Sequence, residues 1–235
     1  MTHTTPPLQK FFTPITAWVP LFISFLLPIW AIIDFMSYRQ VFQNEIHGLS
    51  ELVHALFPLA SAVIVIWILV KYRTQMDKLI FVYLCIMAAG CIYLGGEELS
   101  WGQHHFGWET SEGWKELNTQ DETNLHNNSV LFNLLPRAIL MVGIILGGTV
   151  FQWIKAYRPE LIPTRFLIVY PPATLLMCAI LISVWEIIIQ VSNNFDMTHI
   201  LPLHDGEVQE VFIVWAVLIY ALELRKRFLQ LNASN

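Results

Sequence analysis

The stretch LVHALFPLASAVIVIWILV, residues Leu52–Val70, contains no Asp, Glu, Lys or Arg. A helix needs about 20 mostly apolar residues to cross the ~30 Å hydrocarbon core of a bilayer. The stretch therefore predicts a membrane-spanning helix. Working outward from it, comparable apolar stretches follow at Ile15–Phe35, Leu79–Gly96, Val130–Ile154, Phe166–Val191 and Val208–Leu224. We expect an all-α, polytopic membrane protein with six transmembrane helices, because an open sheet cannot pair its backbone groups in lipid.

The composition agrees with this class. Only 13% of the 235 residues are charged and 55% are hydrophobic, whereas soluble proteins carry about 25% charged residues. We expect one membrane domain, residues 13–228, between cytoplasmic tails at 1–12 and 229–235. The formal net charge of −5 gives no reason to expect a nucleic-acid partner.

The basic residues indicate which way the chain is oriented. Ten of the thirteen lie at Lys10, in the segments 71–78 and 155–165, and in the tail 225–227. By the positive-inside rule these segments and both termini are cytoplasmic. The outer segments are then about 38–51, 97–129 and 192–207, and the loop 101–129 is expected to form an amphipathic lid over the bundle. The expected location is a bacterial cytoplasmic membrane, with the polar site on its periplasmic side.

Each helix that enters from the outer side is preceded or opened by a cluster of histidines and acids. The clusters are Glu51 and His54; Glu122, Asn124, His126 and Asn127; and His204, Glu207 and Glu210. A spacing of three or four residues puts two such groups on one helical face. The Glu-x-x-His form is also found in di-iron and di-manganese bundles. The alternative is that the acids only interact with the positive N-terminal ends of helices.

The third span ends in GGEELSWGQHH, residues 95–105, with two adjacent carboxylates at the hydrocarbon boundary. If the helix continues, Glu98 lies above His105, and Glu97 lies above Trp101. Adjacent residues on a helix point about 100° apart. We therefore expect one carboxylate to act in a site while the other contacts the loop.

Glu186 and Arg137 are charged residues within predicted spans. Glu186 lies about 10 Å inside the outer end of the fifth span. An acid at that depth is expensive unless it is protonated or paired, so it is a candidate functional residue. Arg137 could pair with Glu186 or Glu98, or it could bind an anionic group of a substrate.

Together these residues predict a ring of acids and histidines at the outer level of the bundle. Like charges at this position need protons, Arg137 or metal ions to neutralise them. Histidine and carboxylate ligands suit a divalent zinc, iron or manganese ion. The candidate metal ligands are His126, His54, Glu51, His204, Glu210 and His105, and the candidate catalytic residues are Glu98, Glu97, Glu122 and Glu186.

The stretch GEELSWGQ, followed by GWET and DETNLHNN, resembles a signature of multi-pass bacterial membrane proteins that have no assigned activity. This resemblance covers about thirty residues and singles out Glu97, Glu98, Trp101, Gln103, Glu122, Asn124, His126 and Asn127. Of these, Trp101, Gln103, Asn124 and Asn127 are candidates for binding a substrate. A fainter resemblance is to the CAAX-type membrane proteases, whose Glu-Glu pair is followed four residues later by Arg, where this chain has Gly102.

These observations favour a metal-dependent membrane enzyme. It would hydrolyse or transfer a group on a membrane lipid or lipid-linked substrate, using metal-bound water activated by Glu98 or Glu122. The first alternative is a proton- or cation-coupled transporter with Glu186 as its protonatable group. Further alternatives are a haem- or quinone-binding redox subunit and a structural or sensing protein.

Overall fold

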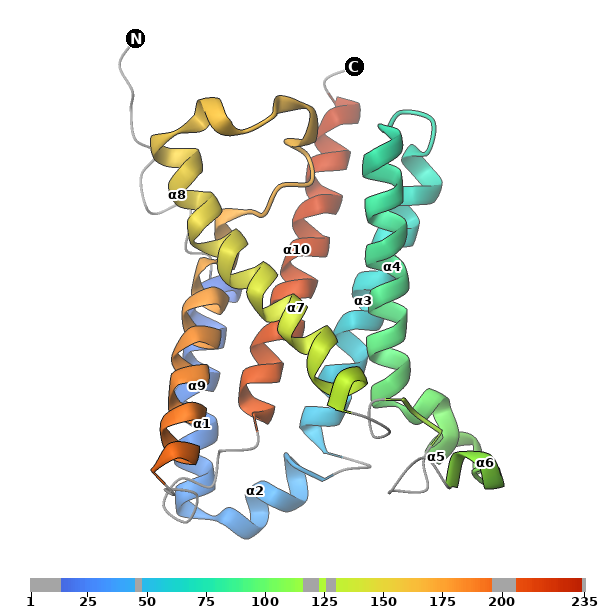
Figure 1. Ribbon diagram of the computed structural model, residues 1–235, viewed down its shortest axis with the longest axis vertical. Helices are drawn as coiled ribbons and strands as arrows, with labels where there is room; N and C mark the ends of the chain where they lie inside the picture. Colours follow the sequence, from blue (N-terminus) through green and yellow to red (C-terminus); the bar gives the residue numbers. More distant parts are fainter. Residues whose placement is uncertain (1–13, 45–47, 116–122, 126–129, 196–205, 234–235) are drawn as a thin grey trace.

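The computed structural model describes residues 14–44, 48–115, 123–125, 130–195 and 206–233, and within these residues it is helical and contains no strand. The long helices run up and down through the molecule, while shorter ones lie at its two ends (Figure 1). Their bounds are α1 Val19–Ile33, α2 Phe35–Val41, α3 Leu49–Tyr72, α4 Lys78–Glu98, α5 Gln103–Phe106, α6 Glu112–Lys115, α7 Val130–Gly148, α8 Val150–Tyr157, α9 Leu176–Asn194 and α10 Glu207–Ala233. A π-helical turn, Pro14–Trp18, precedes α1, and 3-10 turns lie at Ser100–Gly102, Pro159–Leu161, Thr164–Phe166 and Ala173–Leu175.

Five helical stretches in the described residues are long and apolar enough to cross a membrane. They are Thr16–Ile33, Leu49–Tyr72, Lys78–Glu98, Leu134–Tyr157 and Ala173–Asn194. The chain is therefore a membrane protein by the length and composition of its helices. The sixth expected span, Val208–Leu224, lies within α10, which carries more charged residues than the other five. The six-span topology and the cytoplasmic location of the termini stay predictions.

Prolines and glycines explain where the helices differ from the expected spans. The fifth span was expected from Phe166, but α9 begins only at Leu176. Pro171 and Pro172 lie between them; proline lacks a backbone donor and disfavours a helical conformation in the residue before it. The fourth span is interrupted at Thr149, after Gly147 and Gly148, so that α7 and α8 are separate helices.

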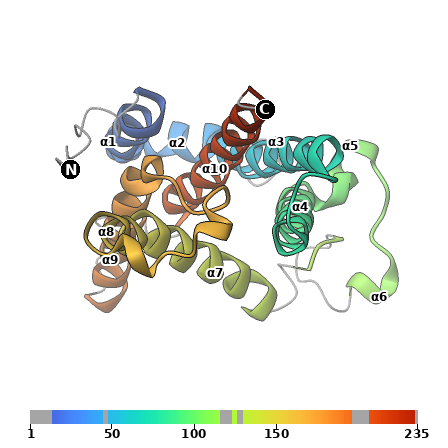
Figure 2. The same ribbon diagram turned by 90° about the horizontal axis from the view of Figure 1, so that it is seen from above.

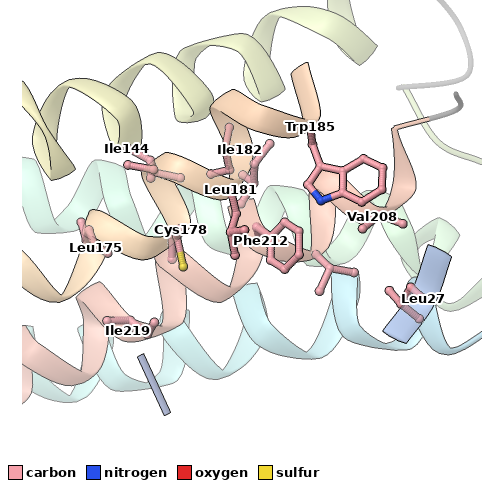
Figure 3. Packing of buried hydrophobic residues seen from close by; sticks show 14 of the residues in the cluster. Leu27, Ile144, Leu175, Cys178, Leu181, Ile182, Trp185, Val208, Phe212 and Ile219 are labelled. Carbon is pink, nitrogen blue, oxygen red and sulfur yellow. The ribbon is translucent and has the colours of Figure 1, made fainter. Parts of the chain in front are cut away.

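α10 is the central helix of the bundle and packs against α3, α7 and α9 (Figure 2). Its largest apolar cluster lies against α9, where Phe212 approaches Ile182 and Trp185, and all three side chains are buried (Figure 3). By contrast, large apolar side chains on the outer faces of the spans are exposed, as at Phe22 and Val70. That arrangement suits helices surrounded by lipid.

The two ends of the bundle differ in charge. The basic end holds the start of α4 and the C-terminal half of α10, where Arg227 Nη1 donates to the carbonyls of Ile168 (2.9 Å) and Tyr170 (2.6 Å). Arg165 donates to Asp77 from Nε (2.8 Å) and Nη2 (2.5 Å). These contacts fix the non-helical segment before α9. The acidic end holds the end of α4, the start of α10 and the first turns of α3 and α7 (Figure 1).

Candidate functional site

Charged side chains from four helices line one cavity of about 210 Å³ at the acidic end. We call it the acidic cavity. Its charged and titratable lining residues are Glu51 and His54 of α3, Glu97 and Glu98 of α4, Arg137 of α7 and Glu210 of α10. Six residues that were candidates from the sequence are therefore brought together in space.

The helix packing explains this convergence. α3 packs along both α4 and α10, and Glu51 and His54 lie three residues apart, on one face of its first turns. Glu210 lies in the first turn of α10, where the positive end of the helix favours an acid by about 0.3–1 kcal/mol. Part of the acidity of this end is therefore explained by helix formation alone.

Arg137 is held by the first turn of α10. Its Nη1 forms a hydrogen-bonded ion pair with Glu210, and its Nη2 donates to Gln209 Oε1 (2.6 Å) and to the carbonyl of Gly206 (3.4 Å). Gly206 has φ 86°, and a Cβ at this position would clash with the guanidinium. Glycine is therefore required here both by the backbone conformation and by the close approach of Arg137.

Gln209 connects this pair to Glu186 of α9. Its side chain is fully buried, and Nε2 donates to Glu186 Oε2 (3.0 Å) and to the carbonyl of Ile182 (3.0 Å). Glu186 also accepts from Gln190 Nε2 (2.9 Å). The expected direct pairing of Arg137 with Glu186 or Glu98 is not what the structure shows, because Gln209 lies between Arg137 and Glu186 and the ion pair is made with Glu210.

His54 lies between two carboxylates. It is 3% exposed, and its Nδ1 is 3.8 Å from Glu98 Oε2 and 3.7 Å from Glu210 Oε2. The carboxyl group of Glu98 also lies within hydrogen-bonding reach of that of Glu51. Two carboxylates cannot hydrogen-bond to each other unless one carries a proton, because an ionised carboxylate is only an acceptor. A hydrogen bond between Glu51 and Glu98 would therefore require one of the two to carry a proton.

Glu97 contacts the outer loop. Its Oε1 accepts from Trp101 Nε1 (2.8 Å) and its Oε2 accepts from the backbone N–H of Leu125 (2.6 Å). The side chain is 3% exposed. The carboxylate thus joins the end of α4 to a loop residue 28 positions further along the chain. This is the loop contact that the sequence led us to expect of one of the two adjacent acids.

Two more candidate residues of the signature, Gln103 and Asn124, support the same loop. Gln103 Nε2 donates to Thr110 Oγ1 (2.7 Å), and Gln103 Oε1 accepts from the backbone N–H of Thr123 (2.6 Å). Asn124 is 1% exposed and donates from Nδ2 to Ser100 Oγ (3.1 Å). The contacts of Gln103, Asn124 and Trp101 are structural ones within this part of the chain, and their role in substrate binding stays a prediction.

The third helix does not continue beyond Glu98, so the stacking of Glu98 above His105 and of Glu97 above Trp101 on one continuous helix does not apply. α4 ends there, and Ser100 and Trp101 have φ of 44° and 53°, in the left-handed region that costs side-chain-bearing residues about 1–3 kcal/mol. The reversal lays the Trp101 ring over Gly96, where a Cβ would lie 2.7 Å from the ring. Gly95 likewise lets α4 approach Leu59 and Ala55 of α3. Both glycines are thus explained by close packing.

The predicted catalytic, substrate-binding and metal-binding residues are only partly described. Glu122, His126, Asn127, His204 and the side chain of His105 lie outside the described residues. Within the part of the chain that is described, no group of three His, Cys, Asp or Glu side chains is placed to hold a metal ion. The donor types around His54 suit a divalent ion, so a metal stays a prediction.

A second, larger cavity of about 770 Å³ adjoins the acidic cavity. We call it the apolar cavity, because its lining consists mainly of aliphatic and aromatic side chains from α4, α7, α10 and the segment before α9. The two cavities share the lining residues Tyr93, Leu94, Pro136 and Leu140. A hydrophilic and a hydrophobic compartment therefore meet within the membrane-spanning helices.

Two residues of this region were not singled out from the sequence. Gln209 could have been noticed as an uncharged amide between Glu207 and Glu210 at the start of the sixth predicted span. Tyr93 lines both cavities, and its hydroxyl is buried with no hydrogen-bond partner in the described part of the chain. A single tyrosine in an apolar span gives no comparable signal in the sequence.

Comparisons of the chain with protein-family models, with curated proteins and with solved structures find no match.

Proposed function

We propose that this protein is a membrane enzyme that hydrolyses or transfers a group on a lipid or another membrane-embedded substrate at the acidic cavity. The observation that supports it is the junction of the acidic cavity with the apolar cavity through Tyr93, Leu94, Pro136 and Leu140. Ligand sites are commonly apolar pockets of about 300–1,000 Å³ with a few convergent polar groups. An amphiphilic substrate would place its reacting group among the acids and its hydrocarbon part in the apolar cavity.

The proposed chemistry uses the Glu51–Glu98 pair as acid and base. With one proton held between the two carboxyl groups, one member would accept a proton from water while the other donates its proton to the leaving group. The water oxygen forms a bond to the substrate as the bond to the leaving group breaks. The pair then again holds one proton. General acid–base catalysis of this kind contributes about 10²–10⁴-fold in rate.

His54 and Arg137 position these groups. His54 lies within 4 Å of both Glu98 and Glu210, so its protonated form would reduce the repulsion between the two acids. Arg137 already donates to Glu210, Gln209 and Gly206. Its contacts support a role in holding α7 against α10, while the binding of an anionic substrate group by Arg137 stays a prediction.

The predicted divalent metal would be an addition to this chemistry. Of the predicted ligands, Glu51, His54 and Glu210 line the acidic cavity, but the described residues do not bring three such side chains together in an arrangement that could hold an ion. A bound ion would supply Lewis-acid stabilisation of the reacting group. The acid–base steps above need only the side chains themselves.

The test is turnover by the purified protein in lipid nanodiscs that contain a total membrane lipid extract and oxygen-18 water. Mass spectrometry should detect products that contain oxygen-18, or exchanged lipid groups if the reaction is a transfer. Glu98→Gln and Glu51→Gln should each lower the rate about 10²-fold or more. Glu112→Gln is the matched control, because Glu112 is exposed in α6, outside the acidic cavity.

The thermal unfolding of each variant shows whether the fold is retained. Full turnover in folded Glu98→Gln and Glu51→Gln would refute the proposal. If no lipid is converted and labelled solutes exchange across vesicles in a counterflow assay, the transporter alternative replaces it.

A further inference from the structure

The apolar cavity follows most of the length of α4. Its lining extends from Leu79 to Leu94, which is roughly 22 Å along a helix at 1.5 Å per residue. One leaflet of a bilayer contributes about half of the ~30 Å hydrocarbon core. The cavity is therefore deep enough for a hydrocarbon chain longer than one leaflet.

Helix packing explains why this space is open. α4 packs along α3, whereas α7 crosses the bundle obliquely and packs against α9 and α10 (Figure 1). The walls on the two sides of the apolar cavity come from α4 and α7.

Two glycines keep the cavity wide. Gly90 of α4 and Gly143 of α7 both line it, and a Cβ at either position would have no atom within 4 Å. Glycine costs a helix about 1 kcal/mol relative to alanine, and in membrane helices it usually permits close packing. Gly95 and Gly148 do pack closely, against Leu59 and Ala179 respectively. At Gly90 and Gly143 the missing side chain instead leaves room for a ligand.

The acidic cavity determines which head group suits such a chain. It contains four carboxyl groups, and its one guanidinium, that of Arg137, is paired with Glu210. Arg137 offsets the charge of only one of these four carboxyl groups. A cation would relieve the repulsion that remains, whereas an anionic head would increase it.

A polar group is also available where the two cavities meet. The hydroxyl of Tyr93 is buried and has no partner among the described residues. An unsatisfied buried hydroxyl costs about 1–3 kcal/mol, and a ligand that passes from one cavity into the other would lie against it. Further along the apolar cavity, the hydroxyls of Tyr83 and Tyr220 satisfy each other at 2.9 Å, so the rest of the wall needs no polar partner.

We propose that the apolar cavity binds the hydrocarbon chain of a lipid with a protonated amine head, and that the ammonium group lies among Glu51, Glu98 and Glu210. The inference rests on the proposed function in that the acidic cavity is the same site. It goes further by naming a long-chain amine lipid as the substrate class.

Two photo-crosslinking probes of equal length test this inference. One is a long-chain primary amine and the other is the fatty acid with the same chain, each with a diazirine in the chain and an alkyne tag. The full-length protein in nanodiscs is labelled, and the labelled peptides are identified by mass spectrometry. We expect the amine to label α4 and α7 about tenfold more than the acid, which corresponds to about 1.4 kcal/mol. An excess of untagged amine should compete.

Matched variants distinguish labelling from within the cavity from labelling by probe dissolved in the bilayer. Gly143→Phe and Gly90→Phe should fill the cavity and reduce labelling by the amine at least about tenfold. Val63→Phe is the control, because Val63 is an exposed residue on α3, outside the cavity. Glu98→Gln should reduce the preference for the amine over the acid, while the chain still labels the cavity.

Equal labelling by the two probes would overturn the choice of head group, and undiminished labelling of α4 and α7 in both folded glycine variants would overturn the chain site. The experiment measures binding and needs no turnover. A protein that binds the amine but converts no lipid would thus refute the proposed function alone, while turnover of lipids without amine binding would refute this inference alone.

Discussion

Replacing Glu97 by Gln tests whether this residue holds the outer loop. The carboxylate accepts from Trp101 Nε1 (2.8 Å) and from the backbone N–H of Leu125 (2.6 Å), and it is 3% exposed. A glutamine offers one oxygen and one NH₂ group, so one of the two donors must face another donor. A hydrogen bond to a charged group contributes about 1.5–3 kcal/mol, and a buried unsatisfied donor costs about 1–3 kcal/mol. We expect the variant to lose about 3 kcal/mol, mainly from the loop.

Hydrogen exchange followed by mass spectrometry measures this loss. If the loop opens locally, a loss of about 3 kcal/mol speeds exchange of the Leu125 amide about a hundredfold. Trp101→Phe removes one donor and leaves the carboxylate in place, so it should have a smaller effect. Glu109→Gln is the control, because Glu109 is an exposed acid of the same loop. Unchanged exchange in Glu97→Gln would show that the carboxylate does not hold the loop.

Three further predictions concern packing, charge and metal. Gly96→Ala places a Cβ 2.7 Å from an indole ring and should destabilise the protein by about 1–3 kcal/mol in thermal unfolding, whereas Gly113→Ala, where a Cβ meets nothing within 4 Å, should not. The guanidinium of Arg165 holds the pKa of Asp77 below its ordinary value of 3.8; this pair therefore stabilises the fold above that value and is lost as the pH falls through the lowered pKa. The melting temperature should fall more between about pH 5 and pH 3 in the native protein than in Asp77→Asn; equal falls would contradict this. If the predicted metal is bound, elemental analysis should show less zinc, iron or manganese in His54→Ala than in the native protein, and equal contents would exclude His54 as a ligand.

Much of the helical pattern follows from the sequence because the signal is long and physically simple. The uncharged run at Leu52–Val70 lies entirely within α3, and the run at Leu79–Gly96 lies within α4. The ends of the helices were harder to predict, since hydropathy does not detect a local interruption of a helix. The apolar residues from Phe166 onward look like a continuous span, yet Pro171 and Pro172 delay the helix to Leu176.

The acidic cavity was predictable in its residues but not in its pairing. Helical spacing places Glu51 beside His54, and the end of the third span places Glu97 and Glu98 at the same level. Which acid pairs with Arg137 depends on the angle at which α7 crosses the bundle, and no local pattern encodes that angle. The reversal at Ser100 is another case, because it depends on contacts with residues more than twenty positions away.

The apolar cavity could not be anticipated from the chain at all. Gly90 and Gly95 look equivalent in the sequence, since both are glycines on an apolar helix. Only the packing shows that one of them touches α3 and the other borders empty space. The cavity exists because α4 and α7 diverge, and the sequence does not show the angle between two helices.

The central position of α10 also has a consequence for how the protein is made. The ribosome makes this helix after α3, α7 and α9, although those helices pack around it. Until α10 has been synthesised, the nascent chain lacks the central helix of the bundle. Arg137 then has none of the partners that α10 provides. A stop codon ahead of Glu207 would therefore leave an assembly without its central helix, which membrane proteases should degrade.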